Sequence, residues 1–153
     1  MVLPFPKDRT VRVLLVEDNL GDAALTLEAF KESKTPVEII RVQDGDAAIA
    51  YLKKKNPYLG AFPADLVLLD LNMPKKNGLE VLEEIRKDPQ LKEIPVLILT
   101  CSQSDADKRR AYDADANFYM VKPADLDEFF EAIQYVEEFW LSRLGFQNPS
   151  QAG

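Results

Sequence analysis

The stretch DLVLLDLNMPKKNG, residues 65–78, decides the fold and carries the first chemical signal in the chain. Its apolar run, Leu66 to Leu69, lies between two aspartates and is typical of a buried strand in a parallel sheet. Asp70 stands where this strand ends, and Pro74 and Gly78 indicate a turn before the next helix. Polar residues stand at the ends of other apolar runs as well, so we expect separate parts of the chain to converge on one pocket with Asp70.

The same alternation of apolar run and amphipathic segment extends along the whole chain. Runs rich in valine, leucine and isoleucine predict four more strands, at residues 11–16, 37–42, 95–99 and 117–121. Apolar residues at helical spacing predict helices at 20–33, 44–54, 78–87, 104–114 and 125–144. Strands that alternate with helices indicate an α/β domain with a parallel sheet covered on both faces. We expect an N-terminal extension (1–10), one domain (11–144) and a flexible tail (145–153).

Apolar spacing also predicts which helical side chains face the core. The expected core stripes include Leu20 and Leu27 in the first helix and Leu126 in the last. The last helix carries more large apolar residues than one face needs, and large exposed aromatics usually mark an interface. We therefore expect two copies of the chain to associate through Phe130, Phe139 and Trp140.

Composition limits the possible functions. The 153 residues include 26 acidic and 19 basic side chains, a net charge of -7, which argues against a nucleic-acid surface. The start lacks a signal-peptide core and no apolar stretch approaches membrane-spanning length, so we expect a cytoplasmic protein that does not enter a membrane. The single cysteine, Cys101, allows no disulfide within the chain, and we expect it to be a small buried residue. No histidine occurs, which excludes Ser-His and Cys-His catalysis.

Polar residues appear where the other apolar strands stop. Glu17 and Asp18 follow the first strand, Thr100 ends the fourth, and Lys122 ends the fifth. The carboxyl ends of parallel strands meet at one edge of the sheet, so these side chains should meet Asp70 there. Three clustered carboxylates need a cation, and oxygen ligands favour Mg²⁺ or Mn²⁺. A carboxylate can also accept a phosphoryl group covalently.

Each of these residues also has a plainer explanation. Asp18 could cap a helix, Asp70 and Asn72 could be turn residues, and Lys122 could be a surface charge. Two other functions also use such a pocket: a metal-dependent phosphohydrolase, and a docking module with a vestigial site. A phosphohydrolase would want an acid or base two residues beyond the nucleophile, where this chain has Asn72. No glycine-rich phosphate loop is present, so the expected phosphodonor is a phosphorylated protein or a small acyl phosphate.

Four motifs together make the chain resemble a two-component response regulator receiver domain over about residues 10–144. They are LLVEDN at 14–19, LVLLDLNMPKKNG at 66–78, PVLILT at 95–100 and FYMVKP at 118–123. The resemblance implies a flavodoxin-like fold whose five-stranded parallel sheet has the order 2-1-3-4-5. It implies a phosphoacceptor that receives its phosphoryl group from a histidine kinase, and not an enzyme that turns over a substrate.

The resemblance also assigns roles to individual residues. Asp70 is the implied phosphoacceptor, and Thr100 and Lys122 contact the phosphoryl group. The implied Mg²⁺ ligands are Asp18, Asp70 and the backbone carbonyl of Asn72, with Glu17 acting through a metal-bound water.

Two further features belong to the family's switch. Tyr119 sits at the aromatic switch position, which implies a change in the face made by the fourth helix, fifth strand and fifth helix. The peptide bond between Lys122 and Pro123 is the one the family holds in cis.

A softer resemblance points to the small regulators that pair with cyanobacterial phytochromes. It lies in EDNLGDAALTLEAF at 17–30, DLNMPKKNGLEVL at 70–82 and EEFWLS at 137–142. It implies a phytochrome-type histidine kinase as the phosphodonor and a homodimer. We expect no output domain after the receiver, so the signal would pass by contact, by dimerisation or as a phosphorelay intermediate. A docking module with little conformational output is the remaining alternative.

Overall fold

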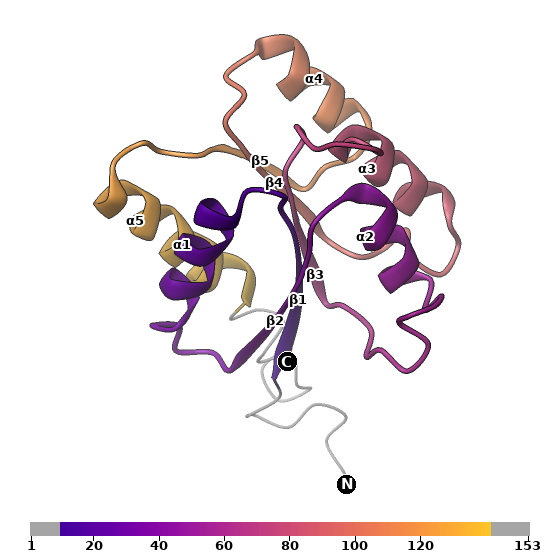
Figure 1. Cartoon of the computed structure of the whole chain (residues 1–153). Coiled ribbons are helices and arrows are strands. Elements are labelled where there is room, and N and C mark those ends of the chain that lie inside the picture. The colour runs from indigo at the N-terminus through magenta and orange to yellow at the C-terminus, as the bar shows by residue number, and fades with distance from the viewer. Residues whose placement is uncertain (1–9, 142–153) are drawn as a thin grey trace, which may run out of the picture.

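The structure, a computed structural model, describes residues 10–141 and consists of a central parallel sheet between two layers of helices (Figure 1). The strands are β1 (Val11–Val16), β2 (Val37–Val42), β3 (Leu66–Leu69), β4 (Val96–Thr100) and β5 (Phe118–Val121). The helices are α1 (Leu20–Phe30), α2 (Gly45–Leu52), α3 (Gly78–Lys87), α4 (Asp105–Asp113), α5 (Leu126–Val136) and a π-helical turn, η1 (Glu137–Leu141). The proposed extension and tail lie mostly outside the described residues.

The sheet has the strand order β2-β1-β3-β4-β5, with all neighbours parallel, which confirms the predicted fold. In register, Val16 lies beside Leu69, and Leu69 lies beside Ile98. These strands therefore end at nearly the same level. Each connection carries a helix across a face of the sheet, as parallel pairing requires.

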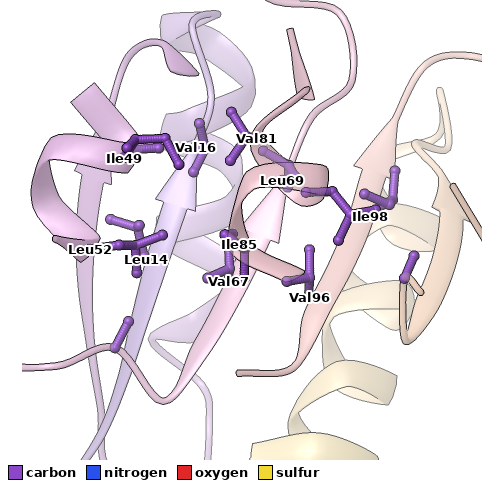
Figure 2. Packing of buried hydrophobic residues seen from close by; sticks show 14 of the residues in the cluster. Leu14, Val16, Ile49, Leu52, Val67, Leu69, Val81, Ile85, Val96 and Ile98 are labelled. Atoms are coloured by element: carbon purple, nitrogen blue, oxygen red, sulfur yellow. The ribbon is translucent and has the colours of Figure 1, made fainter. Parts of the chain in front are cut away.

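Alternate side chains of the strands fill two cores, one on each face of the sheet. Leu14, Val67 and Ile98 belong to the core beneath α2, α3 and α4, where Ile85 of α3 is fully buried (Figure 2). The opposite core contains Val13 and the neighbouring strand residues, packed beneath α1 and α5 (Figure 1). Both faces are thus apolar, and this explains why the strands are continuous apolar runs. No helix within residues 10–141 is long and apolar enough to cross a bilayer.

Five helices begin at a capping side chain. Each cap accepts a hydrogen bond from the backbone N–H three residues later, which satisfies one of the free donors of the first turn. The caps are Asn19, Asp44, Asn77, Ser104 and Asp125. The capping sites fix where the helices start, next to the carboxyl ends of the strands.

Three leucines predicted to face the core are exposed instead. Leu20 is 73% exposed and Leu126 is 53% exposed, and each is the first residue of its helix. Leu27 is also exposed, because the face that α1 buries consists of Ala23, Thr26, Ala29 and Phe30. The Thr26 hydroxyl donates to the backbone oxygen of Asp22 at 2.8 Å, so it can be buried without an unsatisfied polar group.

Other sequence expectations also need correction. The last helix is not one long α-helix, because α5 ends at Val136 and continues as the π-helical turn η1. Cys101 is exposed rather than buried, since it follows the last residue of β4 in a surface loop.

We expect Gly78→Ala to destabilise the protein, because a Cβ there would clash with the backbone oxygen of Asp70. The loop after β3 would have to move, at a cost of about 1–3 kcal/mol in the free energy of unfolding. Gly60→Ala is the matched control, since a Cβ at Gly60 meets nothing within 4 Å. Urea unfolding of both variants measures the difference. Equal stability of the two variants would contradict the close packing at Gly78.

Candidate functional site

The ends of β1 and β3 bring three carboxylates together at one edge of the sheet. Glu17 and Asp18 follow β1, and Asp70 follows β3, the neighbouring strand. One oxygen from each lies within 4.8 Å of the others. Glu17 and Asp70 are buried and Asp18 is exposed, so the group opens towards solvent on one side. Such an all-oxygen cluster fits a hard divalent cation such as Mg²⁺.

The Lys122 ammonium lies against the same group from the end of β5. Its Nζ is 2.6 Å from Glu17 Oε1, 3.0 Å from Asp70 Oδ2 and 2.9 Å from Asp22 Oδ2. Its side chain is only 5% exposed. Burial alone would lower the pKa of Lys122, but the hydrogen bonds to Asp22, Glu17 and Asp70 outweigh burial and raise the pKa. The lysine therefore stays charged and partly neutralises the carboxylates.

Glu17 is the most deeply buried acid of the group, with 2% of its surface exposed. Burial raises the pKa of the Glu17 carboxyl above its ordinary value of 4.5, while the hydrogen bond from Lys122 opposes the rise. Its second oxygen accepts from the backbone N–H of Asn19 at 3.2 Å. Arg41 of β2 donates to the backbone oxygen of Glu17 at 2.9 Å and 2.7 Å. Hydrogen bonds thus fix both the carboxylate and the backbone oxygen of Glu17 at the end of β1.

Asp70 is oriented by the loop that follows it. Its Oδ1 accepts from the backbone N–H of Asn72 at 3.1 Å, and its Oδ2 accepts from Lys122. The loop closes where the Gly78 N–H donates to the Leu71 oxygen at 3.0 Å. A cavity of about 460 Å³ lies beside Asp18 and Asn72, so the acidic cluster is open to solvent and to small molecules on this side.

Thr100 lies at the end of β4 and is connected to Tyr119 through Ser102. The Thr100 hydroxyl accepts from the backbone N–H of Ser102 at 3.3 Å, and the Ser102 oxygen accepts from the Tyr119 hydroxyl at 3.0 Å. The Ser102 hydroxyl donates to Asp107 of α4 at 2.6 Å. Thr100 and Tyr119 are both buried. A movement of Thr100 would therefore reach Tyr119 and α4 through one short loop.

Comparison with known proteins gives this geometry a family. The sequence model of the response regulator receiver domain family matches residues 13–134, which include every residue of the site described in this section. The chain belongs to the response regulator receiver domain family. It is thus a receiver whose role in two-component signalling is that of a phosphoacceptor.

Several relatives of this receiver share most of its length. Response regulator Rcp1 of Synechocystis is 43% identical over 84% of this chain and 88% of its own. The crystal structure of phosphorylated RcpA, a cyanobacterial phytochrome response regulator, matches with a TM-score of 0.86 and 44% identity, covering 92% of this receiver and 99% of RcpA. The Mn²⁺-bound form of Rcp1 matches with a TM-score of 0.82 and 42% identity, covering 86% of this receiver and 94% of Rcp1.

The structure brings most of the predicted site residues together. Glu17, Asp18, Asp70 and Lys122 meet at one point. Thr100 joins them through the backbone of β5, because the Lys122 N–H donates to the Thr100 oxygen at 2.7 Å.

The predicted cis bond before Pro123 is wrong. Among the described residues the cis bond is Asn56–Pro57. Lys122 reaches the carboxylates with the usual trans bond before Pro123.

Sequence reasoning missed three residues that hold the site: Asp22, Arg41 and Ser102. Asp22 lies in the first turn of α1, close in sequence to Glu17 and Asp18, and this nearness is the one signal that could have placed it at the same edge of the sheet. Arg41 and Ser102 act through backbone groups and leave no comparable signal in the sequence.

We expect Glu17→Gln to change how the stability of the metal-free receiver depends on pH. The pKa of Glu17 is raised in the folded state. The contribution of Glu17 to the free energy of unfolding is therefore fully present below pH 4.5, and it is lost as the pH rises through the folded-state pKa. In EDTA, urea unfolding should show the wild type losing stability relative to Glu17→Gln as the pH rises above 4.5. Mg²⁺ at neutral pH should favour the wild type instead. A stability difference that does not change with pH would refute this assignment.

Proposed function

We propose that Asp70 is the residue that accepts the phosphoryl group, in a reaction that depends on Mg²⁺. The observation that supports this most strongly is that the Asp70 carboxylate lies in one cluster with Glu17, Asp18 and the Lys122 ammonium. An Asp70 oxygen attacks the phosphorus atom, and the bond from phosphorus to the donor atom breaks. The donor leaves with the electron pair, and Asp70 becomes an acyl phosphate.

The metal ligands in this proposal are Asp18, Asp70 and the Asn72 carbonyl, with Glu17 acting through water. The structure of Rcp1, a relative of this receiver, is of its Mn²⁺-bound form, and this supports divalent metal binding by this receiver. A bound Mg²⁺ would neutralise negative charge on the transferring group. Asn72 is an exposed amide and not an acid, which favours a phosphoryl group that persists over rapid hydrolysis.

Thr100 and Lys122 are the proposed sensors of the phosphoryl group. Hydrogen bonds to charged groups contribute about 1.5–3 kcal/mol each, so two contribute about 3–6 kcal/mol. Reversing a 1:99 equilibrium requires about 5.5 kcal/mol. The link from Thr100 through Ser102 to Tyr119 supports a change in the face formed by α4, β5 and α5. Tyr119 is the proposed switch residue.

The proposed phosphodonor is a histidine kinase of the phytochrome type. This rests on the similarity of the receiver to RcpA, which is a cyanobacterial phytochrome response regulator. Incubation of the receiver with candidate kinases and ATP, followed by the rate of phosphoryl transfer to Asp70, tests the pairing. A phytochrome kinase should transfer faster than unrelated histidine kinases. Equal transfer rates from all kinases would contradict the pairing.

The proposed homodimer uses aromatic residues of α5 and η1. Phe139 is exposed and stacks on the exposed ring of Tyr135 at 5.5 Å between centroids. Phe130 and Trp140 are half-buried, and both pack against the core beneath α1 and α5 of the same chain. Phe139 and Tyr135 therefore offer more surface to a partner than the other two predicted residues.

We expect Phe139→Ala to weaken self-association. Sedimentation at micromolar concentrations should show a dimer for the wild type and a shift towards monomer for the variant. Phe62→Ala is the control, because Phe62 is exposed on the loop before β3. A wild type that stays monomeric with and without an acyl phosphate would remove the dimer.

A further inference from the structure

Asp22 contacts the sensing lysine but does not belong to the group of carboxylates that could hold the metal. It lies in the first turn of α1, and its Oδ2 is 2.9 Å from Lys122 Nζ. Its side chain is 32% exposed, while the Glu17 side chain at the same ammonium is 2% exposed. Among the described residues, the group of carboxylates able to share a cation is Glu17, Asp18 and Asp70. The Asp22 carboxylate thus contacts Lys122 without belonging to the candidate metal ligands.

The Lys122 ammonium has no free donor for a phosphoryl oxygen. A lysine ammonium carries three N–H groups, and Glu17, Asp22 and Asp70 accept one each. A phosphoryl group on Asp70 adds further acceptor oxygens beside this ammonium. Lys122 can bind one of them only by releasing or sharing a present partner.

Asp22 is the partner that Lys122 can release at the lowest cost. Water can replace the ammonium around a carboxylate that is one-third exposed, but not around the buried Glu17 carboxylate. A cavity of about 360 Å³ borders Asp22 and Lys122 and gives water access to the contact. The Glu17 contact is also shorter, at 2.6 Å.

We propose that Asp22 is a positioning residue that holds Lys122 in the unphosphorylated receiver and releases it when Asp70 carries a phosphoryl group. Asp22 and the phosphoryl group compete for the Lys122 ammonium. Phosphorylation of Asp70 would therefore break a contact of the first turn of α1. This inference depends on the proposed role of Asp70 and adds a residue that opposes phosphoryl binding.

The test is the affinity of the receiver for beryllofluoride, a phosphoryl mimic, measured by calorimetry at saturating Mg²⁺. We expect Asp22→Asn to bind it about three- to tenfold more tightly than the wild type, because Lys122 no longer has to leave a carboxylate. Asp127→Asn is the matched control, since Asp127 is an exposed acid in the first turn of α5 and loses the same charge. It should bind like the wild type.

A second comparison separates this role from a general change in charge. In a Lys122→Ala background, Asp22→Asn should leave the affinity for beryllofluoride unchanged, since the effect passes through the lysine. Asp22→Glu keeps the charge and should remain close to the wild type.

The outcomes separate this inference from the proposed function. If the wild type does not bind beryllofluoride in a manner that requires Mg²⁺ and Asp70, the proposed function fails. If the wild type binds but Asp22→Asn binds no more tightly, the role of Asp22 is refuted. A tightening that persists without Lys122 refutes it as well, because the effect is then general electrostatics.

Discussion

Asp70→Asn should abolish labelling of the receiver by acetyl phosphate. The amide keeps the shape of the side chain and can still accept from the backbone N–H of Asn72, so the loop after β3 should be preserved. It removes the anionic oxygen that attacks phosphorus and one of the clustered carboxylates. Intact-protein mass spectrometry with Mg²⁺ measures the phosphorylated fraction. We expect a wild-type fraction that grows with time and a variant fraction at background.

The control for this variant is Asp65→Asn. Asp65 lies just before the opposite end of β3 and accepts from the backbone N–H of Arg12 at 2.8 Å, which an asparagine oxygen can also do. It should be labelled like the wild type. Full labelling of Asp70→Asn would place the phosphoryl group on another residue and defeat the proposed site.

Lys122→Ala should have the largest effect on stability among the site variants. The change leaves Glu17 and Asp70 buried beside each other without their ammonium, and breaking a buried ion pair costs about 3–5 kcal/mol. Urea unfolding in EDTA measures this loss, and Mg²⁺ should restore part of it by replacing the missing positive charge. The variant should still be labelled at Asp70 but lose the conformational response.

Lys31→Ala is the control for the loss of a lysine. Lys31 Nζ is 3.2 Å from Glu28 Oε1, but both side chains are mostly exposed, and exposed pairs contribute about 1 kcal/mol or less. If both lysine variants lose the same stability, Lys122 does not neutralise buried carboxylates. A Lys122→Ala variant that keeps its full conformational response would show that the lysine is not a sensor.

The strands and their terminal residues could be predicted because one physical rule governs them. Buried parallel strands must be apolar throughout, so the point where polar residues begin marks the edge of the sheet. Glu17, Asp70, Thr100 and Lys122 are all recognised in this way, and the structure places them at that edge. The strand order came from the resemblance and not from the apolar pattern.

Side chains on helices and loops were harder to predict, because their neighbours depend on packing. Leu126 fits a helical stripe, yet it lies at the helix start beyond the core. All five α-helices carry an acid in the first turn, and only the path of Lys122 makes Asp22 of α1 its partner. Ser102 contacts Thr100 and Tyr119 through backbone atoms, which no residue type reveals.

The arrangement has a consequence for signalling. Lys122 is bound to α1 through Asp22, while Thr100 is linked to α4 and Tyr119 through Ser102. Phosphorylation of Asp70 can therefore act on both layers of helices, which lie on opposite faces of the sheet (Figure 1). The aromatic residues of α5 and η1 belong to the layer that contains α1.

A crystal structure of the receiver with Mg²⁺ and beryllofluoride tests the central claim most directly. We predict the mimic on an Asp70 oxygen, with Mg²⁺ beside Asp18 and the Asn72 carbonyl, and with Thr100 and Lys122 in contact with fluorine atoms. An adduct on another residue, or Mg²⁺ bound away from the acidic cluster, would contradict the account.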